Sequence, residues 1–117
     1  MQIPTIKHFS AADFGLQIWK YDFDCGTRLG VKVVEYLSCG LPIIITKNVG
    51  GAYWYVKRYG IGVVVSSNES FNELQKLLRG RGSMRKKCRE FAKTHFSVES
   101  ASINYINIYK SFYRGEI

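Results

Sequence analysis

Apolar residues between positions 30 and 46 follow a pattern that predicts a helix, a tight turn and a buried strand. The apolar positions recur every three or four residues, which gives one broad apolar face to a helix over 30–39; its members are Val31, Val34, Tyr36, Leu37 and Leu41. Gly40 stands where a helix C-cap favours a left-handed residue, and Pro42 then prevents continuation. The β-branched run 43–45 is typical of a strand covered on both faces. This order indicates the αβ half of a parallel α/β unit.

The rest of the chain alternates between strand-like and helix-like segments in the same way. Strands are predicted near residues 12–19, 42–46 and 61–65. Helices are predicted near residues 30–39, 52–59, 69–79, 83–95 and 98–113. Residues 1–10 have little periodicity and are expected to form a lead-in. The sequence therefore predicts an α/β fold, a partial Rossmann-like parallel sheet flanked by helices, in one domain over residues 1–117.

Composition and charge narrow the function classes. The chain is 46% hydrophobic and 22% charged, as ordinary soluble domains are, and it carries a net charge of +8, which favours an anionic partner. Its three cysteines are scattered and lack metal-ligand spacing, so reduced thiols are expected. Asp22 and Asp24 have no further carboxylate nearby, and we interpret them as part of a solvated loop and expect no metal site.

A candidate ligand site lies in the loop before the predicted helix 30–39. This loop carries Arg28, Lys32 follows at the start of the helix, and Glu35 lies one turn inside it. A helix N-terminus offers free N–H donors and a partial positive charge, so a phosphorylated ligand is expected there. Gly50 and Gly51 follow the predicted strand 42–46, where bare backbone would let the ligand approach closely.

These motifs resemble the C-terminal half of retaining GT-B glycosyltransferases that use nucleotide-sugar donors. The resemblance rests on Lys32-x-x-Glu35-Tyr-Leu-x-x-Gly40-x-Pro42-Ile-Ile, on Gly50-Gly51, on Gly60-x-Gly62-Val-Val-Val and on Ala12-Asp13-Phe-Gly15-Leu16. The chain departs from the family at two positions, because Thr27 and Trp54 stand where the family often has glutamates. A complete GT-B enzyme has two Rossmann-like domains, so the resemblance implies an incomplete second domain that is inactive alone.

The resemblance also implies roles for the candidate residues. Glu35 would bind the ribose, and Arg28 and Lys32 would act in catalysis by compensating charge on the leaving diphosphate. The remaining donor-binding positions would be Leu29, Gly30, Val31, Gly50 and Gly51. The reaction would be hexosyl transfer from a nucleotide-diphosphate sugar to a glycan or lipid-linked acceptor in polysaccharide or glycoconjugate biosynthesis. It requires no cofactor, and a missing N-terminal domain would hold the acceptor.

Other interpretations of the sequence stay open. A nucleotide-sugar epimerase or a phosphorylase could share this fold, and a basic nucleic-acid-binding module or a purely structural α/β domain would fit the composition. Nucleic acid is not the expected partner, because no recognised motif is present and the aromatic residues follow helical core spacing. We expect a cytoplasmic protein, and peripheral contact with the inner membrane face is compatible with this expectation. An exposed sheet edge is expected to cause self-association.

Overall fold

The computed structural model describes residues 3–20, 29–47, 50–66 and 69–116. The helices are α1 (Ile3–Ala11), α2 (Val31–Ser38), α3 (Gly50–Tyr59), α4 (Glu69–Arg79), α5 (Arg81–Phe96) and α6 (Val98–Tyr113). The strands are β1 (Gly15–Gln17), β2 (Ile43–Thr46) and β3 (Gly62–Val65).

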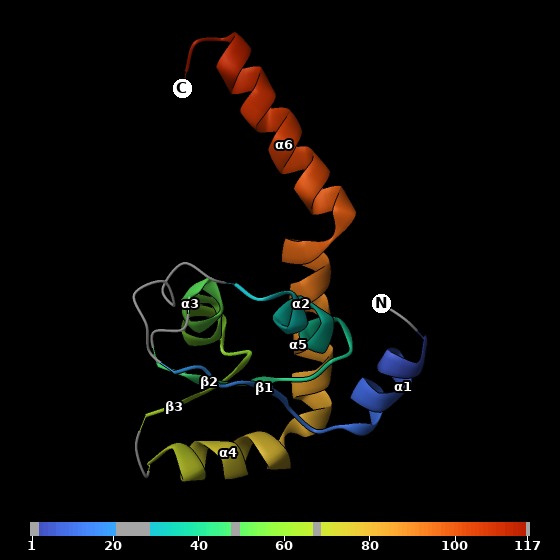
Figure 1. Ribbon diagram of the computed structural model, residues 1–117, viewed down its shortest axis with the longest axis vertical. Coiled ribbons are helices and arrows are strands. Elements are labelled where there is room, and N and C mark those ends of the chain that lie inside the picture. Colours follow the sequence, from blue (N-terminus) through green and yellow to red (C-terminus); the bar gives the residue numbers. More distant parts are fainter. Residues whose placement is uncertain (1–2, 21–28, 48–49, 67–68, 117) are drawn as a thin grey trace.

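The three strands form one parallel sheet in the order β1-β2-β3, which confirms the predicted fold class. Gly15 is paired with Ile43, and Ile43 with Gly62, so the strands are in register across the sheet. Helices α2 and α3 cover one face and α4 lies on the other, while α5 packs along α2 (Figure 1). The result is a small three-layer α/β unit.

The core lies between the sheet, α2, α3 and α5. Its buried members are Val33, Leu37, Ile43, Ile45, Ala52, Val56, Ile61, Cys88, Phe91 and Ala92. The predicted apolar face of α2 was wrong in one respect, because Val31 is 77% exposed whereas Val33 is 1% exposed. The reason is that Val31 is the first residue of α2, beyond the part of the helix that α5 and the sheet cover. The residues of α2 that pack into the core are Val33 and Leu37, which lie four residues and about one helical turn apart.

The turns that follow α2 and α3 are formed by glycines with positive φ. Gly40 has φ 77° directly after the C-cap residue Cys39, and the Leu41 amide donates to the Tyr36 carbonyl at 2.9 Å. Gly60 has φ 62° at the corresponding place after α3. Both turns return the chain into a parallel strand, as the predicted glycine C-cap requires.

The basic residues of α5 belong partly to the structure. Arg81 contacts Asp13 at 3.2 Å, and Arg85 donates to the Ala12 carbonyl, so α5 holds the segment that leads into β1. The C-terminal half of α5 packs on α3 through rings; Tyr55, Tyr59, Phe91, His95 and Phe96 lie with centroids 4.3–6.2 Å apart. The predicted helix 83–95 begins two residues earlier, at Arg81, so Gly82 lies inside α5.

The N-terminal region differs from its prediction. Residues 3–11, where a lead-in was expected, form the helix α1, and Phe9 packs on Tyr36 with ring centroids 5.0 Å apart. The predicted strand 12–19 is shorter, because only Gly15–Gln17 pairs with β2. Leu16 and Ile18 are 59% and 55% exposed, so no described residue covers this part of the edge strand.

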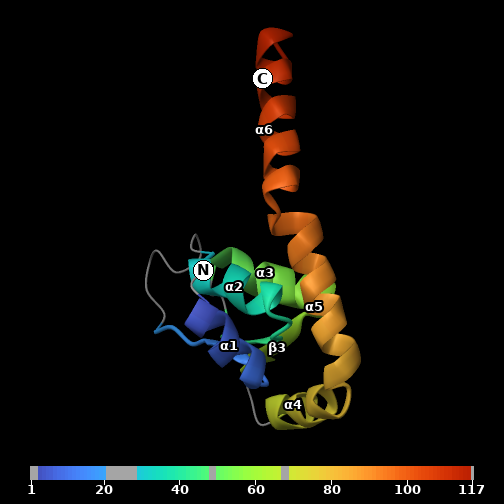
Figure 2. The ribbon, with the colours of Figure 1, turned by 90° about the vertical axis from the view of Figure 1, so that its right-hand side faces the viewer.

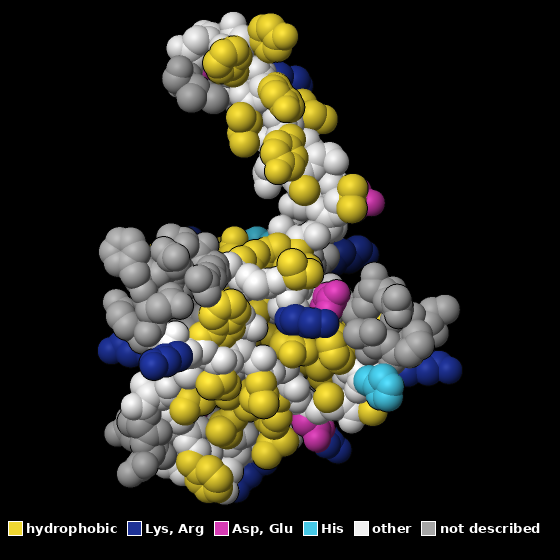
Figure 3. Space-filling model, viewed as in Figure 1, with side chains coloured by type: hydrophobic (Ala, Val, Ile, Leu, Met, Phe, Trp, Pro, Cys, Tyr) yellow, Lys and Arg dark blue, Asp and Glu magenta, His cyan; other side chains and the backbone are white. Residues whose placement is uncertain are grey.

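Helix α6 projects away from the rest of the molecule (Figures 1 and 2). It begins with a serine cap, since Ser97 Oγ accepts from the Ser100 amide at 3.1 Å. Its large apolar side chains are exposed (Figure 3); these are Val98, Ile103, Tyr105, Ile106, Ile108, Tyr109, Phe112 and Tyr113. On α4, Phe71 is also 64% exposed.

Candidate functional site

The candidate site lies where the carboxyl ends of the strands meet the starts of α2 and α3. The exit of β1 is tied to the end of β2, because the Trp19 amide donates to Thr46 Oγ1 at 3.2 Å and Thr46 Oγ1 donates to the Trp19 carbonyl at 3.3 Å. In open parallel sheets, ligands bind in the crevice outside these strand ends. The geometry therefore places the exits of β1 and β2 at the expected position of a ligand.

Gly30 forms the start of α2 and shapes the loop that leads into it. It has φ 82° and ψ 122°, a conformation that favours glycine, and no side chain of the described residues caps the helix. The Val33 amide donates to the Gly30 carbonyl at 3.2 Å, whereas the described residues provide no partner for the amides of Val31 and Lys32. The first turn of α2 therefore presents N–H groups that could donate hydrogen bonds to an anion.

Lys32 and Glu35 face each other one turn apart on α2. Lys32 Nζ lies 3.4 Å from Glu35 Oε2, and their side chains are 62% and 23% exposed. Lys32 Nζ also lies 5.7 Å from the centroid of the Phe9 ring, which comes from α1. A pair this exposed contributes at most about 1 kcal/mol, so a ligand can separate the two groups at little cost. Lys32 could then interact with a phosphate and Glu35 with hydroxyl groups.

The start of α3 meets the start of α2. Gly50 has φ 57° and opens α3, and a Cβ atom on Gly51 would lie 3.7 Å from Leu29 Cδ1. The structure thus brings Leu29 close to Gly51. Gly30, Val31 and Lys32 follow Leu29 directly in the chain and therefore lie near the same place. The predicted catalytic residue Arg28 lies outside the described residues, as do Thr27, Asp22 and Asp24.

Residues 27–95 match the protein family described as Glycosyl transferases group 1. The match covers more than half of the chain. The chain belongs to this family. The matched segment of the glycosyltransferase begins in the loop before α2 and ends within α5, so it includes every candidate site residue. Neither curated proteins nor solved structures give a significant match. The resemblance drawn from the sequence is therefore confirmed at the level of the family.

Gln17 is a residue of the glycosyltransferase that the sequence analysis did not single out. It ends β1, is 5% exposed, and lies so close to the loop that a Cβ atom on Gly30 would be 2.7 Å from Gln17 Nε2. In a half-buried strand the apolar side chains usually face the core and the polar ones face solvent. Here the polar Gln17 is buried, and its apolar neighbours Leu16 and Ile18 are exposed. The available signal was this polar residue at the carboxyl end of a strand, where ligand-binding side chains concentrate. We interpret Gln17 as a support for the Gly30 loop.

The described cysteines of the glycosyltransferase are buried thiols. Burial raises the pKa of Cys88 to about 12, and its Sγ lies 3.7 Å from the Ile61 carbonyl oxygen. Burial also raises the pKa of Cys39. The charge of Glu35 raises this pKa further, and the charge of Arg89 lowers it. Such thiols stay protonated and are poor nucleophiles and metal ligands. Within the described ranges, no three His, Cys, Asp or Glu side chains form a group that could hold a metal ion.

None of the described helices of the glycosyltransferase is both long and apolar enough to cross a membrane.

Proposed function

We propose that this chain binds the nucleoside diphosphate of a nucleotide-sugar donor between the starts of α2 and α3. The observation that carries the proposal is the closeness of these two helix starts beside the Lys32–Glu35 pair: a Cβ atom added to Gly51 would lie 3.7 Å from Leu29 Cδ1. Two helix N-termini supply backbone donors and positive potential for phosphate groups. A carboxylate one turn away supplies the acceptor that ribose hydroxyl groups need.

Each residue has a distinct task in the proposed mechanism. The backbone amides of Leu29, Gly30 and Val31 hold the diphosphate. Glu35 exchanges its contact with Lys32 for the ribose hydroxyls, and Lys32 is then free to turn toward the diphosphate together with Arg28. As the glycosidic bond breaks, negative charge grows on the leaving diphosphate, and preorganised donors of this kind stabilise such charge by about 3 kcal/mol each.

The open glycines at the start of α3 complete the donor side of the proposed site. Gly50 and Gly51 carry no side chain between the backbone of α3 and the crevice, so the sugar–diphosphate part of the donor can approach closely. The proposed donor is a nucleotide-activated hexose, and no cofactor takes part in the step.

The acceptor belongs to a second domain in this proposal. A retaining GT-B active site lies in the cleft between two Rossmann-like domains, and this chain supplies the donor side of it. The exposed apolar side chains of α6 are the surface that the second domain would cover. The acceptor would be a glycan or lipid-linked sugar in polysaccharide or glycoconjugate biosynthesis, used in the cytoplasm or at the inner membrane face.

A panel of ligands tests the proposal. Calorimetric titration of the chain with the diphosphates of uridine, guanosine and adenosine at 150 mM salt should give saturable one-to-one binding for at least one of them. Random-sequence oligonucleotides serve as the comparison, because a merely basic surface binds them with steep salt dependence. If oligonucleotides bind tightly and no nucleoside diphosphate binds, the chain is a nucleic-acid-binding module and the proposal is wrong.

Activity of the isolated chain provides a second check. Holding both reactants together contributes up to ~7–11 kcal/mol to an enzymatic reaction, and this chain holds only the donor in the proposed arrangement. We expect no transfer from labelled nucleotide sugars to a pool of glycan or lipid-linked acceptors. Multiple turnovers by the 117-residue chain would contradict the assignment of the acceptor to a second domain.

A further inference from the structure

The outer edge of β3 carries backbone groups that the sheet leaves unpaired. The Ile43 amide donates to the Ile61 carbonyl at 3.1 Å, and Ile43 is the register partner of Gly62. In a parallel ladder, this register turns the N–H and C=O groups of Gly62 and Val64 away from β2. No described backbone group pairs with the Gly62 amide, the Gly62 carbonyl or the Val64 amide on that outer side.

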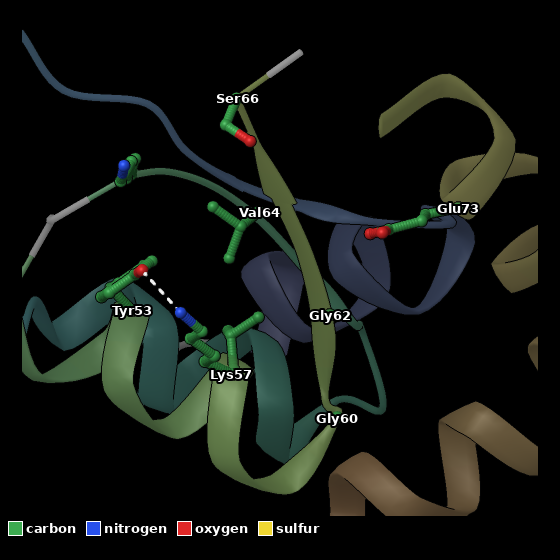
Figure 4. A pocket seen from close by; sticks show the side chains of 9 residues that line it. Tyr53, Lys57, Gly60, Gly62, Val64, Ser66 and Glu73 are labelled. Carbon is green, nitrogen blue, oxygen red and sulfur yellow. Dashed lines mark hydrogen bonds between the residues drawn. The ribbon is translucent and has the colours of Figure 1, made fainter. Parts of the chain in front are cut away.

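A groove of about 490 Å³ runs along this edge (Figure 4). Its floor is the backbone of β3, one wall is α3 with Tyr53 and Lys57, and Glu73 of α4 lies on the other side of the strand. Gly62 must be glycine here, because a Cβ atom would overlap the Ile43 carbonyl group. The floor therefore has no side chain at the position where the unpaired backbone groups lie.

One end of the open edge is closed by Ser70. The Ser66 amide donates to Ser70 Oγ at 3.1 Å, and Ser70 Oγ donates to the Val64 carbonyl at 3.2 Å. The hydroxyl group thus occupies the two backbone groups that a neighbouring strand would use next. Pairing with an added strand is limited to a short stretch centred on Gly62, which defines where a ligand would start and end.

Charge distinguishes the two sides of the groove. Lys57 Nζ lies 3.4 Å from the Tyr53 hydroxyl oxygen and 5.7 Å from the centroid of its ring, so Tyr53 holds the ammonium group over the groove. Lys47, at the end of β2, adds a second positive charge to the lining. Side chains of an added strand alternate between the two faces. Those on the α3 side would meet two lysines, and those on the α4 side would meet Glu73.

We propose that the edge of β3 is a docking site for an extended acidic segment of a partner protein, which adds a short fourth strand to the sheet. Main-chain hydrogen bonds to Gly62 and Val64 give the segment its register, and carboxylates at alternate positions contact Lys57 and Lys47. A free phosphate or other small anion would use the lysines but not the Gly62 carbonyl. The site adjoins the proposed donor site at Lys47, which follows β2, and at Tyr53 in the first turn of α3, but the rest of its lining follows the outer edge of β3 and not the start of α2.

Peptide titrations followed by amide chemical shifts test this proposal. The probe is the capped peptide Ac-Val-Glu-Val-Glu-Val-NH2, and the readout is the shift of the Gly62 and Val64 amide resonances in chain labelled with ¹⁵N. We expect saturable shifts at both amides. Matched controls are Ac-Val-Lys-Val-Lys-Val-NH2, which should bind more weakly, and an N-methylated version of the acidic peptide, which loses main-chain donors.

Substitutions separate the charge contribution from general effects of net charge. Lys57→Glu should weaken the acidic peptide about five-fold or more, and Lys93→Glu, on the exposed side of α5, should change its affinity less than two-fold. Nucleoside diphosphate binding should stay unchanged in Lys57→Glu. A failure of the docking proposal can therefore be distinguished from a failure of the proposed donor site.

Four results would overturn the proposal. Equal binding of the N-methylated peptide, or the same shifts with inorganic phosphate alone, would show simple anion binding. Shifts at Gly62 and Val64 that depend on protein concentration without peptide would show that a second copy of the chain occupies the edge. Unchanged amide resonances at saturating peptide would show that the edge accepts no strand.

Discussion

Replacing Gly30 by alanine tests whether the start of α2 is built as the site requires. At φ 82° and ψ 122°, a residue with a side chain costs about 1–3 kcal/mol in backbone strain. The new Cβ atom would also lie 2.7 Å from Gln17 Nε2, and Gln17 is 5% exposed and has little room to move. We expect Gly30→Ala to lower the free energy of unfolding by about 2–3 kcal/mol.

Gly82→Ala is the matched control for this substitution. Gly82 lies within α5, and a Cβ atom there meets no atom within 4 Å. Because alanine is the better helix former, Gly82→Ala should raise the free energy of unfolding by about 0.5–1 kcal/mol. Urea unfolding followed by far-ultraviolet circular dichroism, with a common m-value, measures both variants. If the two variants agree within about 0.5 kcal/mol, the strained start of α2 is not a feature of the folded chain.

Three further predictions follow from burial. Leu37→Ala should cost about 2–5 kcal/mol of unfolding free energy, whereas Val31→Ala should cost under about 0.5 kcal/mol, and equal costs in urea unfolding would contradict the packing of α2. The pKa of Cys88 is raised from 9.0 to about 12, so its contribution to stability is complete below pH 9 and is lost as pH rises toward 12. Between pH 9 and 11 the wild type should therefore lose roughly 2–3 kcal/mol more than Cys88→Ala, and parallel pH profiles would refute this. Ile106→Glu and Tyr109→Glu should reduce self-association in sedimentation velocity and change unfolding by under about 0.5 kcal/mol, and unchanged association would exclude α6 as its cause.

Local signals in the sequence predicted much of the fold. Gly40 and Gly60 stand where helices end, and the β-branched runs after them can pair only as buried strands, so the parallel sheet followed. The phase of α2 could not be predicted in the same way. Val31, Val33 and Val34 are all apolar, and only the position of α5, which comes fifty residues later, decides that Val33 is buried.

The site was predicted less completely than the fold. The glycines and the Lys32–Glu35 spacing marked the starts of α2 and α3, and the structure brings Leu29 and Gly51 together there. Gln17 could not be found by spacing, because its burial depends on the tertiary contact with Gly30. The exposure of α6 also went unpredicted, since an apolar stripe indicates that a helix face needs a partner and does not say which surface supplies it.

Calorimetry on Glu35 variants tests the proposed donor site most directly. The ligands are the nucleoside diphosphate that binds most tightly and its 2′,3′-dideoxyribose counterpart, and the control variant is Glu90→Gln on the exposed side of α5. Glu35→Gln should weaken binding of the ribose ligand by roughly 1.5–3 kcal/mol and leave binding of the dideoxyribose ligand nearly unchanged. Glu90→Gln should change the binding of neither ligand. Equal losses for the two ligands, or no loss in Glu35→Gln, would contradict the assignment of Glu35 to the ribose and with it the proposed donor site.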